Sequence, residues 1–397
     1  MRKINLDQNA TTPLDPRVRE AIDDAWRAEY ANAASQHALG RRARSALEDA
    51  RERISAVLGA RRPGTRLVMT SGGTEANNLA LFGLAGESPG RVVVSAIEHA
   101  SVLASAARLE RRGWEVVRIG ATGDGVIDLD QLLAAISKPT RLVSLMWGNN
   151  DTGVLQPIAE VAEICRAAGV PLHTDAVQAV GKLAVDFDRL GATALSLAAH
   201  KFHGPRGIGA LVVDGDAPLE SVLCGGFHQQ GLRPGTESVE LAIGLCRALE
   251  LWASEADERY QRMARLRDRF EGLLRAGRAG LVVNGANAAR LPHTSNVSFV
   301  GLDRQELFVA LDLAGVHCSP GSACASGSSE PSAVLQAMGL PDTLLNSALR
   351  FSLGATTTEV EVDDAAARIL QVCNDLEGSK LGRKIAATSP AGTSNSL

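Results

Sequence analysis

Short apolar runs recur along the first half of the chain, and the stretches between most of them alternate apolar and polar residues with a helical period. The helix-like stretches include residues 101–112, 128–137 and 158–168. Strands that alternate with amphipathic helices form βαβ units, with helices on both faces of a mainly parallel sheet. The pattern therefore predicts an α/β fold whose large domain has a mainly parallel seven-stranded sheet. Its strands are expected at residues 66–70, 91–96, 115–119, 141–146, 170–173, 194–197 and 209–213.

The pattern changes after Pro234-Gly235-Thr236, where a long helix is predicted at residues 238–275. Because the chain has 397 residues, it exceeds the ~250–300 residues at which a single core stops growing. We expect a large domain at 15–255, a smaller α/β domain made of 1–14 and 256–380, and a disordered tail at 381–397, where the residues are small and polar. Shorter elements of the smaller domain are expected at 295–300, 304–313, 332–338, 349–353 and 359–374.

Composition excludes several classes of protein. A net charge of −4 gives no general attraction to nucleic acid or to an anionic membrane, and 4% aromatic residues make a base-stacking surface unexpected. No apolar stretch reaches the ~18–20 residues of a membrane span, and the N-terminal residues lack the apolar core of a signal peptide. Six cysteines without a Cys-x-x-Cys pair indicate neither a disulfide framework nor a zinc site. We expect a cytoplasmic protein without a metal.

Candidate chemistry lies just after the predicted strands, where parallel α/β sheets bind their ligands. Residues 70–78 form a glycine-containing turn that opens a helix, which is typical of a phosphate site, although such turns are also common without a ligand. Asp175 and Lys201 follow two later strands. Pyridoxal 5′-phosphate (PLP) needs a lysine for its Schiff base and a carboxylate that keeps its pyridine nitrogen protonated. Taken alone, a surface lysine paired with an aspartate explains these two residues as well.

Ordered motifs along nearly the whole chain resemble those of the cysteine desulfurases of the NifS/IscS type, in the class V aminotransferase family of PLP fold type I. Together they are far more specific than any single motif. The resemblance implies a PLP-dependent enzyme that converts L-cysteine to L-alanine and places the sulfur on Cys324 as a persulfide. The similar stretches are residues 10–18, 71–78, 98–99, 149–153, 156–158, 173–178, 200–205, 233–237, 321–327, 330–335 and 350–354.

The resemblance also assigns the cofactor contacts. Lys201 would carry the Schiff base, Asp175 would bond the pyridine nitrogen, and His99 would stack on the ring and serve as a candidate acid or base. Gln178 and Asn150 would contact the ring hydroxyl and the substrate side.

The phosphate and the substrate carboxylate have their own implied partners. Gly73, Thr74, His200 and the partner subunit's Thr236 would hold the phosphate, so the resemblance implies a homodimer. Arg350 would grip the substrate carboxylate, for which the fork of a guanidinium is suited. The alternative for Arg350 is a salt bridge that stabilises the fold.

Cys324 lies in a stretch of small and polar residues that cannot form a core, which indicates a mobile loop suited to a thiol that visits a substrate and then an acceptor. Cys318 is a possible second thiol but matches no catalytic position of the family. The other four cysteines, Cys165, Cys224, Cys246 and Cys373, are expected to pack as small apolar side chains.

Three positions depart from the family pattern. Ala198 stands where a phosphate-binding serine is usual, so its backbone amide is the expected contact, with Ser196 as a partial substitute. Asp151 replaces a glutamate. Residues 225–231 read Gly-Gly-Phe-His-Gln-Gln-Gly instead of Gly-Gly-Gly-Gln-Glu-Arg-Gly.

Two rival functions remain open at this stage. A selenocysteine lyase, or another PLP lyase or aminotransferase, would share the fold, and a non-catalytic scaffold protein is a rival of a different class. The expected partner is a sulfur-acceptor protein such as an iron–sulfur scaffold. The sequence does not identify the acceptor, nor the group that activates Cys324.

Overall fold

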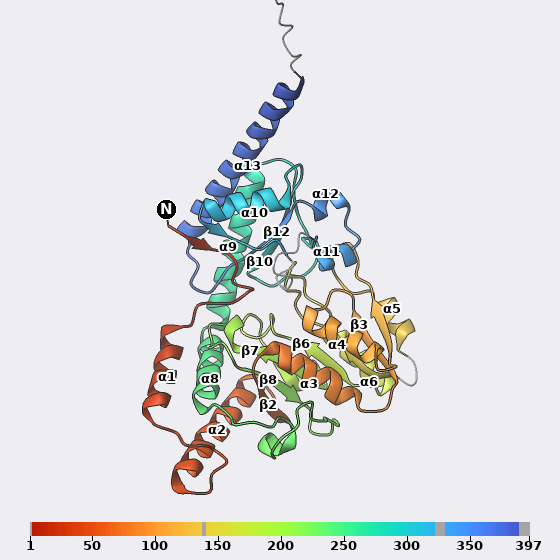
Figure 1. Cartoon of the computed structure of the whole chain (residues 1–397), viewed down its shortest axis with the longest axis vertical. Helices are drawn as coiled ribbons and strands as arrows, with labels where there is room; N and C mark the ends of the chain where they lie inside the picture. The colour runs from red at the N-terminus through yellow and green to blue at the C-terminus, as the bar shows by residue number, and fades with distance from the viewer. Residues whose placement is uncertain (1, 137–139, 322–329, 389–397) are drawn as a thin grey trace, which may run out of the picture.

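The computed structural model describes residues 2–136, 140–321 and 330–388 of the chain. Figure 1 shows two lobes joined by a long helix, with a large sheet in one lobe and smaller sheets in the other. The N-terminal strand lies beside the smaller lobe, although helix α1 (Pro16–Arg27) lies beside the larger lobe. The chain therefore crosses between the lobes soon after it begins.

The larger lobe contains the predicted seven-stranded sheet. β8 pairs antiparallel with both of its neighbours, and all other pairs are parallel, so the prediction of a mainly parallel sheet is confirmed. Predicted and observed strand limits agree at eight of the fourteen ends and differ by one or two residues at the other six. In spatial order the strands are β2 (Arg66–Thr70), β8 (Gly209–Val213), β7 (Ala194–Ala198), β6 (Leu172–Asp175), β5 (Thr140–Ser144), β3 (Arg91–Ser95) and β4 (Glu115–Ile119).

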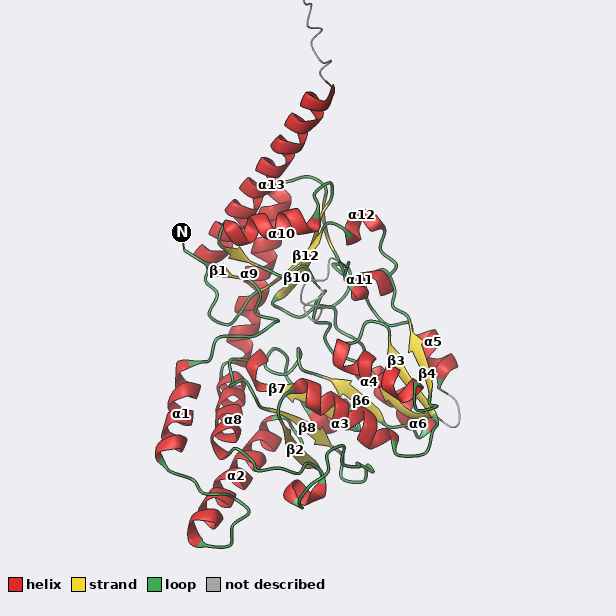
Figure 2. Ribbon diagram, in the orientation of Figure 1, coloured by secondary structure: helices red, strands yellow, loops and turns green. Residues whose placement is uncertain are grey.

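Helices cover both faces of this sheet (Figure 2). Successive residues of a strand point to opposite faces, and β3 shows the result: Val92 and Val94 join one hydrophobic cluster and Val93 joins another. The first cluster includes residues of α3 (Gly73–Ala85) and α4 (Ala100–Glu110). The second includes residues of α2 (Ala38–Val57), α5 (Leu129–Ala135), α6 (Ile158–Ala168), α7 (Phe187–Leu190) and α8 (Val239–Ser254).

The smaller lobe has its own hydrophobic cluster, which joins Ile4 and Leu6 from the start of the chain to Phe270, Phe299 and Phe351. Its antiparallel sheet has the order β12 (Ala348–Ser352), β10 (Thr294–Phe299) and β9 (Leu281–Val283), while β1 (Ile4–Asn5) pairs in parallel with β11 (Val316–His317). The helices of this part are α9 (Ala256–Gly277), α10 (Arg304–Leu313), α11 (Ala333–Ala337), α12 (Asp342–Leu345) and α13 (Glu359–Thr388).

Two predicted helices differ from the observed ones. The long helix expected at 238–275 is two helices, α8 and α9, which meet at Glu255. The carboxylate of Glu255 accepts hydrogen bonds from Arg17 and Arg259, and these contacts fix the junction. The last helix is longer than expected and continues to Thr388, because good helix formers such as Leu, Lys and Ala follow Asn374. None of the described helices combines the length and apolar character that a membrane crossing needs.

Candidate active site

Five of the predicted site residues lie at one edge of the large sheet. β2, β3, β5, β6 and β7 all run in the same direction, so their carboxyl ends share that edge. There a ligand site is expected in an open α/β sheet. The residues are Gly73 after β2, His99 after β3, Asn150 after β5, Asp175 at the end of β6 and Lys201 after β7, at the end of the short 3-10 helix η1 (Ala199–Lys201).

Asp175 is a buried carboxylate with two hydrogen-bond donors. Its Oδ2 accepts from Asn77 Nδ2 at 2.6 Å, and its Oδ1 accepts from the backbone amide of Val177 at 3.0 Å. The side chain is only 4% exposed. The two bonds orient the carboxylate at the strand end, as a partner for a ring nitrogen must be oriented.

His99 is linked to Asp175 through two side chains that the sequence did not single out. Asn77 Nδ2 also donates to Ser101 Oγ at 2.9 Å, and Ser101 Oγ lies 2.8 Å from His99 Nδ1. The backbone amide of Ser101 donates to the same Nδ1, so Nδ1 is the acceptor and the ring proton lies on Nε2. Burial lowers the pKa of His99; Asp175 partly offsets this, and Lys201 lowers the pKa further. The imidazole is therefore neutral near pH 7.

The amine of Lys201 is held against the N-terminal segment. Its Nζ donates to the carbonyl oxygens of Asn9 at 2.6 Å and Ala10 at 3.0 Å. Gln178 Nε2 donates to the same Asn9 oxygen at 3.1 Å, while Gln178 Oε1 is buried and has no hydrogen-bond partner. The amine, the amide and a residue from the start of the chain thus meet at the sheet edge.

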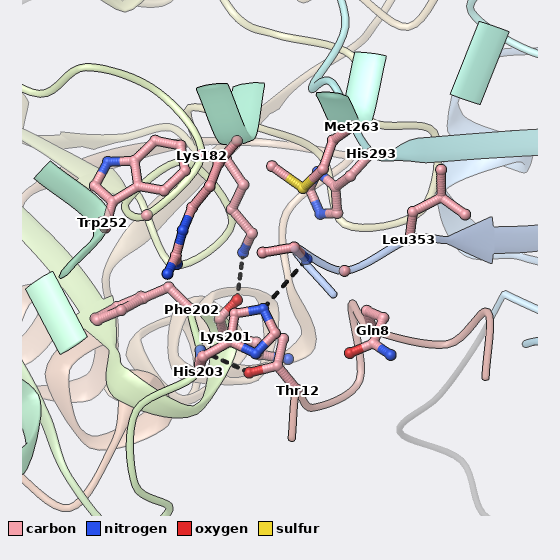
Figure 3. A pocket seen from close by; sticks show the side chains of 14 residues that line it. Gln8, Thr12, Lys182, Lys201, Phe202, His203, Trp252, Met263, His293 and Leu353 are labelled. Atoms are coloured by element: carbon pink, nitrogen blue, oxygen red, sulfur yellow. Dashed lines mark hydrogen bonds between the residues drawn. The ribbon is translucent and has the colours of Figure 1, made fainter. Parts of the chain in front are cut away.

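A small cavity lies beside Lys201 between the lobes (Figure 3), and Lys182, His203 and His293 help to line it. Lys182 Nζ donates to the backbone carbonyl of Lys201 at 2.7 Å. Burial lowers the pKa of Lys182 to about 7, and the charge of Lys201 acts in the same direction. Lys182 was not identified from the sequence, where it follows a glycine without any motif of its own.

Two of the predicted phosphate contacts, Gly73 and Thr74, lie in the first turn of α3. Gly72 provides no side-chain cap for this helix, so the backbone N–H groups of its first turn have no side-chain acceptor there. A Cβ at position 73 would lie 2.7 Å from Val177 Cγ2, which explains the glycine. Thr74 is exposed, and Ala198 is buried below Gly73. Backbone N–H groups at a helix start fit a phosphate.

Two further predicted contacts have other hydrogen-bond partners in the structure. His200 Nδ1 lies 3.2 Å from Thr11 Oγ1, and burial, reinforced by Lys201, lowers the pKa of His200 to about 4. Ser196 was considered as a substitute for the serine missing at position 198, but its hydroxyl lies 2.9 Å from His173 Nε2 and is fully buried. The structure therefore gives Ser196 a structural contact instead.

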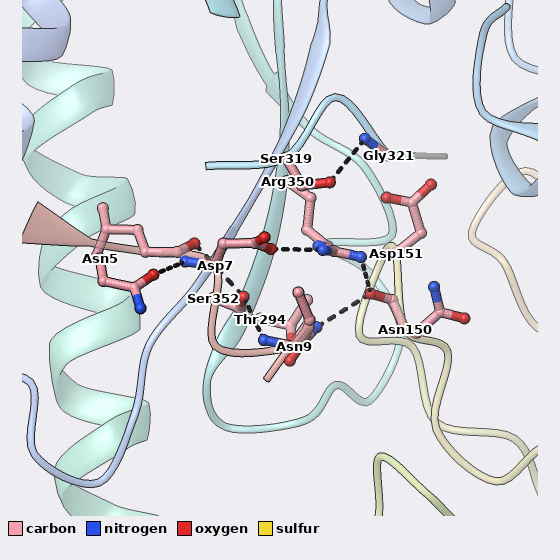
Figure 4. A network of polar contacts seen from close by, with 12 residues as sticks. Asn5, Asp7, Asn9, Asn150, Asp151, Thr294, Ser319, Gly321, Arg350 and Ser352 are labelled. Carbon is pink, nitrogen blue, oxygen red and sulfur yellow. Dashed lines mark hydrogen bonds and ion pairs between the residues drawn. The ribbon is translucent and has the colours of Figure 1, made fainter. Parts of the chain in front are cut away.

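Arg350 lies where β12 faces the large lobe (Figure 4). It is 2% exposed, its NH2 group pairs with Asp7 Oδ1 at 2.6 Å, and its NH1 group donates to the carbonyl oxygen of Asn150 at 3.1 Å. Its Nε is buried without a hydrogen-bond partner. The salt bridge raised as the alternative for Arg350 therefore exists, and it holds the guanidinium next to Asn150.

One predicted residue, Thr236, is not brought to the site by this single chain. Thr236 is exposed in the loop before α8. Cys324 lies outside the described residues. Two described residues that flank this segment, Gly321 and Ser332, lie beside Asp151, and Ser332 Oγ donates to the Asp151 carboxylate.

The remaining cysteines differ in exposure. Cys165, Cys246 and Cys373 are buried, and burial raises the pKa of Cys165 to about 12. Cys318 is buried too, and burial raises the pKa of its thiol far above the usual value. The packing expected for Cys224 is wrong, because its side chain is exposed. Within the described parts of the chain, no group of three or more His, Cys, Asp or Glu side chains could hold a metal ion.

Comparisons with known proteins agree with this geometry. Residues 4–364 match the family model described as aminotransferase class-V, so the chain belongs to the class-V aminotransferase family.

Individual relatives and solved structures are more specific than the family model. The chain is 37% identical over 390 residues to a protein of Dictyoglomus turgidum named "Cysteine desulfurase IscS", covering 97% of this chain and 98% of that protein. A NifS-like protein from Rickettsia africae has a similar structure, with a TM-score of 0.86, 28% identity and coverage of 94% and 100%. A structure described as "SspA in complex with cysteine" has a TM-score of 0.79, 33% identity and coverage of 89% and 100%.

Proposed function

We propose that this chain is a PLP-dependent cysteine desulfurase, which converts L-cysteine to L-alanine and transfers the sulfur to Cys324 as a persulfide. One observation supports the proposal most directly. The Lys201 amine, the Asp175 carboxylate and the His99 imidazole lie at the same edge of the sheet as the N-terminus of α3, which has no side-chain cap. The desulfurase name of the Dictyoglomus relative and the cysteine bound by the SspA relative support the reaction and the substrate.

The residues at this edge fit PLP. Gly73, Thr74 and His200, with the backbone amide of Ala198, would bind its phosphate. Asp175 would hold the proton on its ring nitrogen, and His99 would lie on its ring face. Gln178 and Asn150 would reach the ring hydroxyl. The orphaned Gln178 Oε1 and the uncapped start of α3 are polar groups that such a ligand would satisfy.

When bound, PLP supplies a ring that withdraws electrons and so stabilises negative charge on the substrate Cα. Lys201 would anchor the cofactor and then move the Cα proton of cysteine, because its amine lies at the strand end, where it donates to the carbonyls of Asn9 and Ala10. His99 is neutral near pH 7, so it can accept or donate a proton at this site.

Arg350 would bind the carboxylate of the substrate. Asp7 and the Asn150 carbonyl fix two sides of its guanidinium, and Nε is left without a partner. A carboxylate can accept two parallel hydrogen bonds from a guanidinium. In this proposal the fold-stabilising ion pair and the substrate contact belong to the same side chain, with Asp7 as the residue that orients it.

The sulfur step is balanced by the substrate and one protein thiol. The thiolate of Cys324 attacks the substrate sulfur, the Cβ–S bond breaks, and an S–S bond forms. The electron pair and a proton end on Cβ, which gives alanine, and both cysteine sulfurs become the persulfide. No outside oxidant is required. A thiolate is the nucleophilic form of cysteine.

Other parts of the proposal concern assembly. In a homodimer, the partner's Thr236 would complete the phosphate site. The hydrophobic cluster that joins Ile4 and Leu6 to later residues supports a small domain at 1–14 and 256–380 beside a large domain at 15–255. The short helices α11 and α12 pack instead against the cluster of the large lobe. The acceptor would be an iron–sulfur scaffold or another thiolated product, and the cytoplasmic location stays a prediction from the sequence.

The Cys324→Ala variant tests the proposal, with Cys318→Ala as its matched control. Cys324→Ala should keep the absorbance of bound PLP and its response to L-cysteine, but produce no sulfide in the presence of dithiothreitol. Cys318→Ala removes a buried thiol and should retain sulfide production. Normal sulfide production by Cys324→Ala would reject the assignment, and so would a wild-type chain that forms no alanine from cysteine.

A further inference from the structure

Asp151 is a buried carboxylate in the turn that follows β5. It is 1% exposed. The side chain of Asn149 shapes the turn: its Oδ1 accepts from the backbone amides of Asp151 and Thr152, both at 2.9 Å. Asn150 immediately precedes Asp151, and its carbonyl oxygen accepts a hydrogen bond from Arg350 NH1. The carboxylate is therefore fixed beside two groups of the candidate active site.

Both oxygens of this carboxylate are used by the smaller lobe. Asp151 Oδ1 accepts from Asn296 Nδ2 of β10 at 3.0 Å. Asp151 Oδ2 accepts from the hydroxyl of Ser332, which is 3% exposed and caps the start of α11. Ser332 is the second residue after Glu330, where the description of the chain resumes. One end of the 322–329 segment is thus tied to Asp151.

The other end of the segment meets the same carboxylate. Gly321 has a φ of +100°, and a Cβ at this position would lie 3.1 Å from Asp151 Oδ2 and 3.2 Å from Ser332 Cβ. Figure 4 shows the Asp151 side chain beside Gly321. Two residues earlier, Ser319 exchanges backbone hydrogen bonds of 3.0 and 2.8 Å with Arg350. A side chain at 321 would disturb this close approach.

A buried arginine also lies at this junction. Arg304 is 4% exposed, and its NH1 group donates to the carbonyl oxygen of Pro320 at 3.5 Å. Burial lowers the pKa of Arg304, and the charges of Asp303, Asp151 and Glu330 act against that change. Positive charge near Asp151 offsets part of the cost of burying a carboxylate.

We propose that Asp151 is a positioning residue for the sulfur-transfer step, because it contacts both Gly321 and Ser332, which flank the stretch of sequence that contains Cys324, and lies next to Asn150, which Arg350 contacts. The proposal rests on the proposed function. Cys324 is three residues after Gly321, and three residues span at most ~11 Å.

The test separates cofactor chemistry from sulfur transfer. Asp151→Asn keeps the shape of the side chain but loses one of its two acceptors. The rate at which L-cysteine changes the absorbance of bound PLP should stay within ~3-fold of wild type, while alanine formation and persulfide on Cys324 should slow by ~10-fold or more, as for a lost bond to a charged group. Ser332→Ala should show the same split, and the double variant should be no slower than Asp151→Asn, since the two residues share one interaction.

The control is Glu271→Gln, which replaces another buried carboxylate of similar exposure that pairs with Arg290. It should leave the ratio of the two rates unchanged. An equal fall of both rates in Asp151→Asn, or no fall in either, would overturn the inference. Should Asp151→Asn not fold, Ser332→Ala decides by the same criterion. A wild-type chain that makes no alanine refutes the proposed function itself, whereas variants that behave like an active wild type refute only the role of Asp151.

Discussion

The groups at the carboxyl edge of the large sheet and the groups at the junction with the smaller lobe reach the candidate site by different routes. Asp175 ends one strand of the large sheet, and His99 and Lys201 follow two others. Backbone amides of nearby residues donate to Asp175 and His99. Lys201 instead donates to Asn9 and Ala10, which lie 192 and 191 residues earlier in the chain. At the junction, Arg350 reaches Asp7 across 343 residues of sequence. It also contacts Asn150, which comes from a third segment.

This difference indicates that the two regions have different roles in the proposed reaction. The sheet edge is rigid because the strands on which it depends are buried on both faces. The junction depends on hydrogen bonds between the lobes, so its geometry requires both lobes to be in place. We therefore expect substitutions at the sheet edge to abolish the reactions that depend on bound PLP. Substitutions at the junction should weaken substrate binding or sulfur transfer while the cofactor remains bound.

The largest expected effect is that of Lys201→Ala. Loss of the amine removes the anchor of the cofactor and the group that moves the Cα proton, so alanine formation should fall by at least ~10³-fold. Alanine is measured by chromatography, and the absorbance of bound PLP is recorded in parallel. Lys3→Ala, a change at an exposed lysine, should have no effect. Full activity of Lys201→Ala would place the cofactor chemistry elsewhere.

A smaller effect is expected from Arg350→Lys, which tests the junction. An ammonium cannot donate two parallel bonds to a carboxylate, so kcat/KM for L-cysteine should fall by ~10–100-fold. The absorbance of bound PLP without substrate should not change. Arg290→Lys alters another buried, ion-paired arginine of the smaller lobe and serves as the control. If Arg350→Lys lost its cofactor, the two regions would not be separable in the way that we describe.

The smallest effect concerns stability at the sheet edge. Burial raises the pKa of Glu98 to about 8 from an ordinary value of 4.5. Between pH 4.5 and pH 8 the Glu98 carboxyl ionises in the unfolded chain but stays protonated in the folded one, so the free energy of unfolding falls as the pH rises. This loss of stability is absent below pH 4.5 and complete above pH 8. Glu98→Gln cannot ionise. Its Tm relative to wild type should therefore be higher at pH 9 than at pH 5.5, by at least about 3 °C.

The measurement is thermal unfolding followed by circular dichroism at both values of pH. Any effect of the amide on packing is the same at both and cancels in the comparison. A Tm difference that does not change with pH would mean that Glu98 has the same charge throughout this range.

Local pattern was a good guide to the sheet edge. Alternating strands and helices predicted the seven-stranded sheet, and Asp175 and Lys201 lie together at its carboxyl edge. It was a poor guide to side-chain partners. Asn77 lies within the motif at 71–78, yet its bonds to Asp175 and Ser101 depend on how α3, β6 and α4 pack. The break at Glu255 was missed because Arg17, which helps to fix it, is far away in sequence.

The sequence by itself determined the class of fold, the order of its elements and the residue types able to bind PLP, because hydrophobic periodicity and strand–helix alternation are local properties of the chain. Only the tertiary structure decided that Asp7 orients Arg350 and that Asp151 meets both Gly321 and Ser332. Those contacts join segments more than a hundred residues apart. Their existence depends on the packing of the two lobes, which no local pattern records.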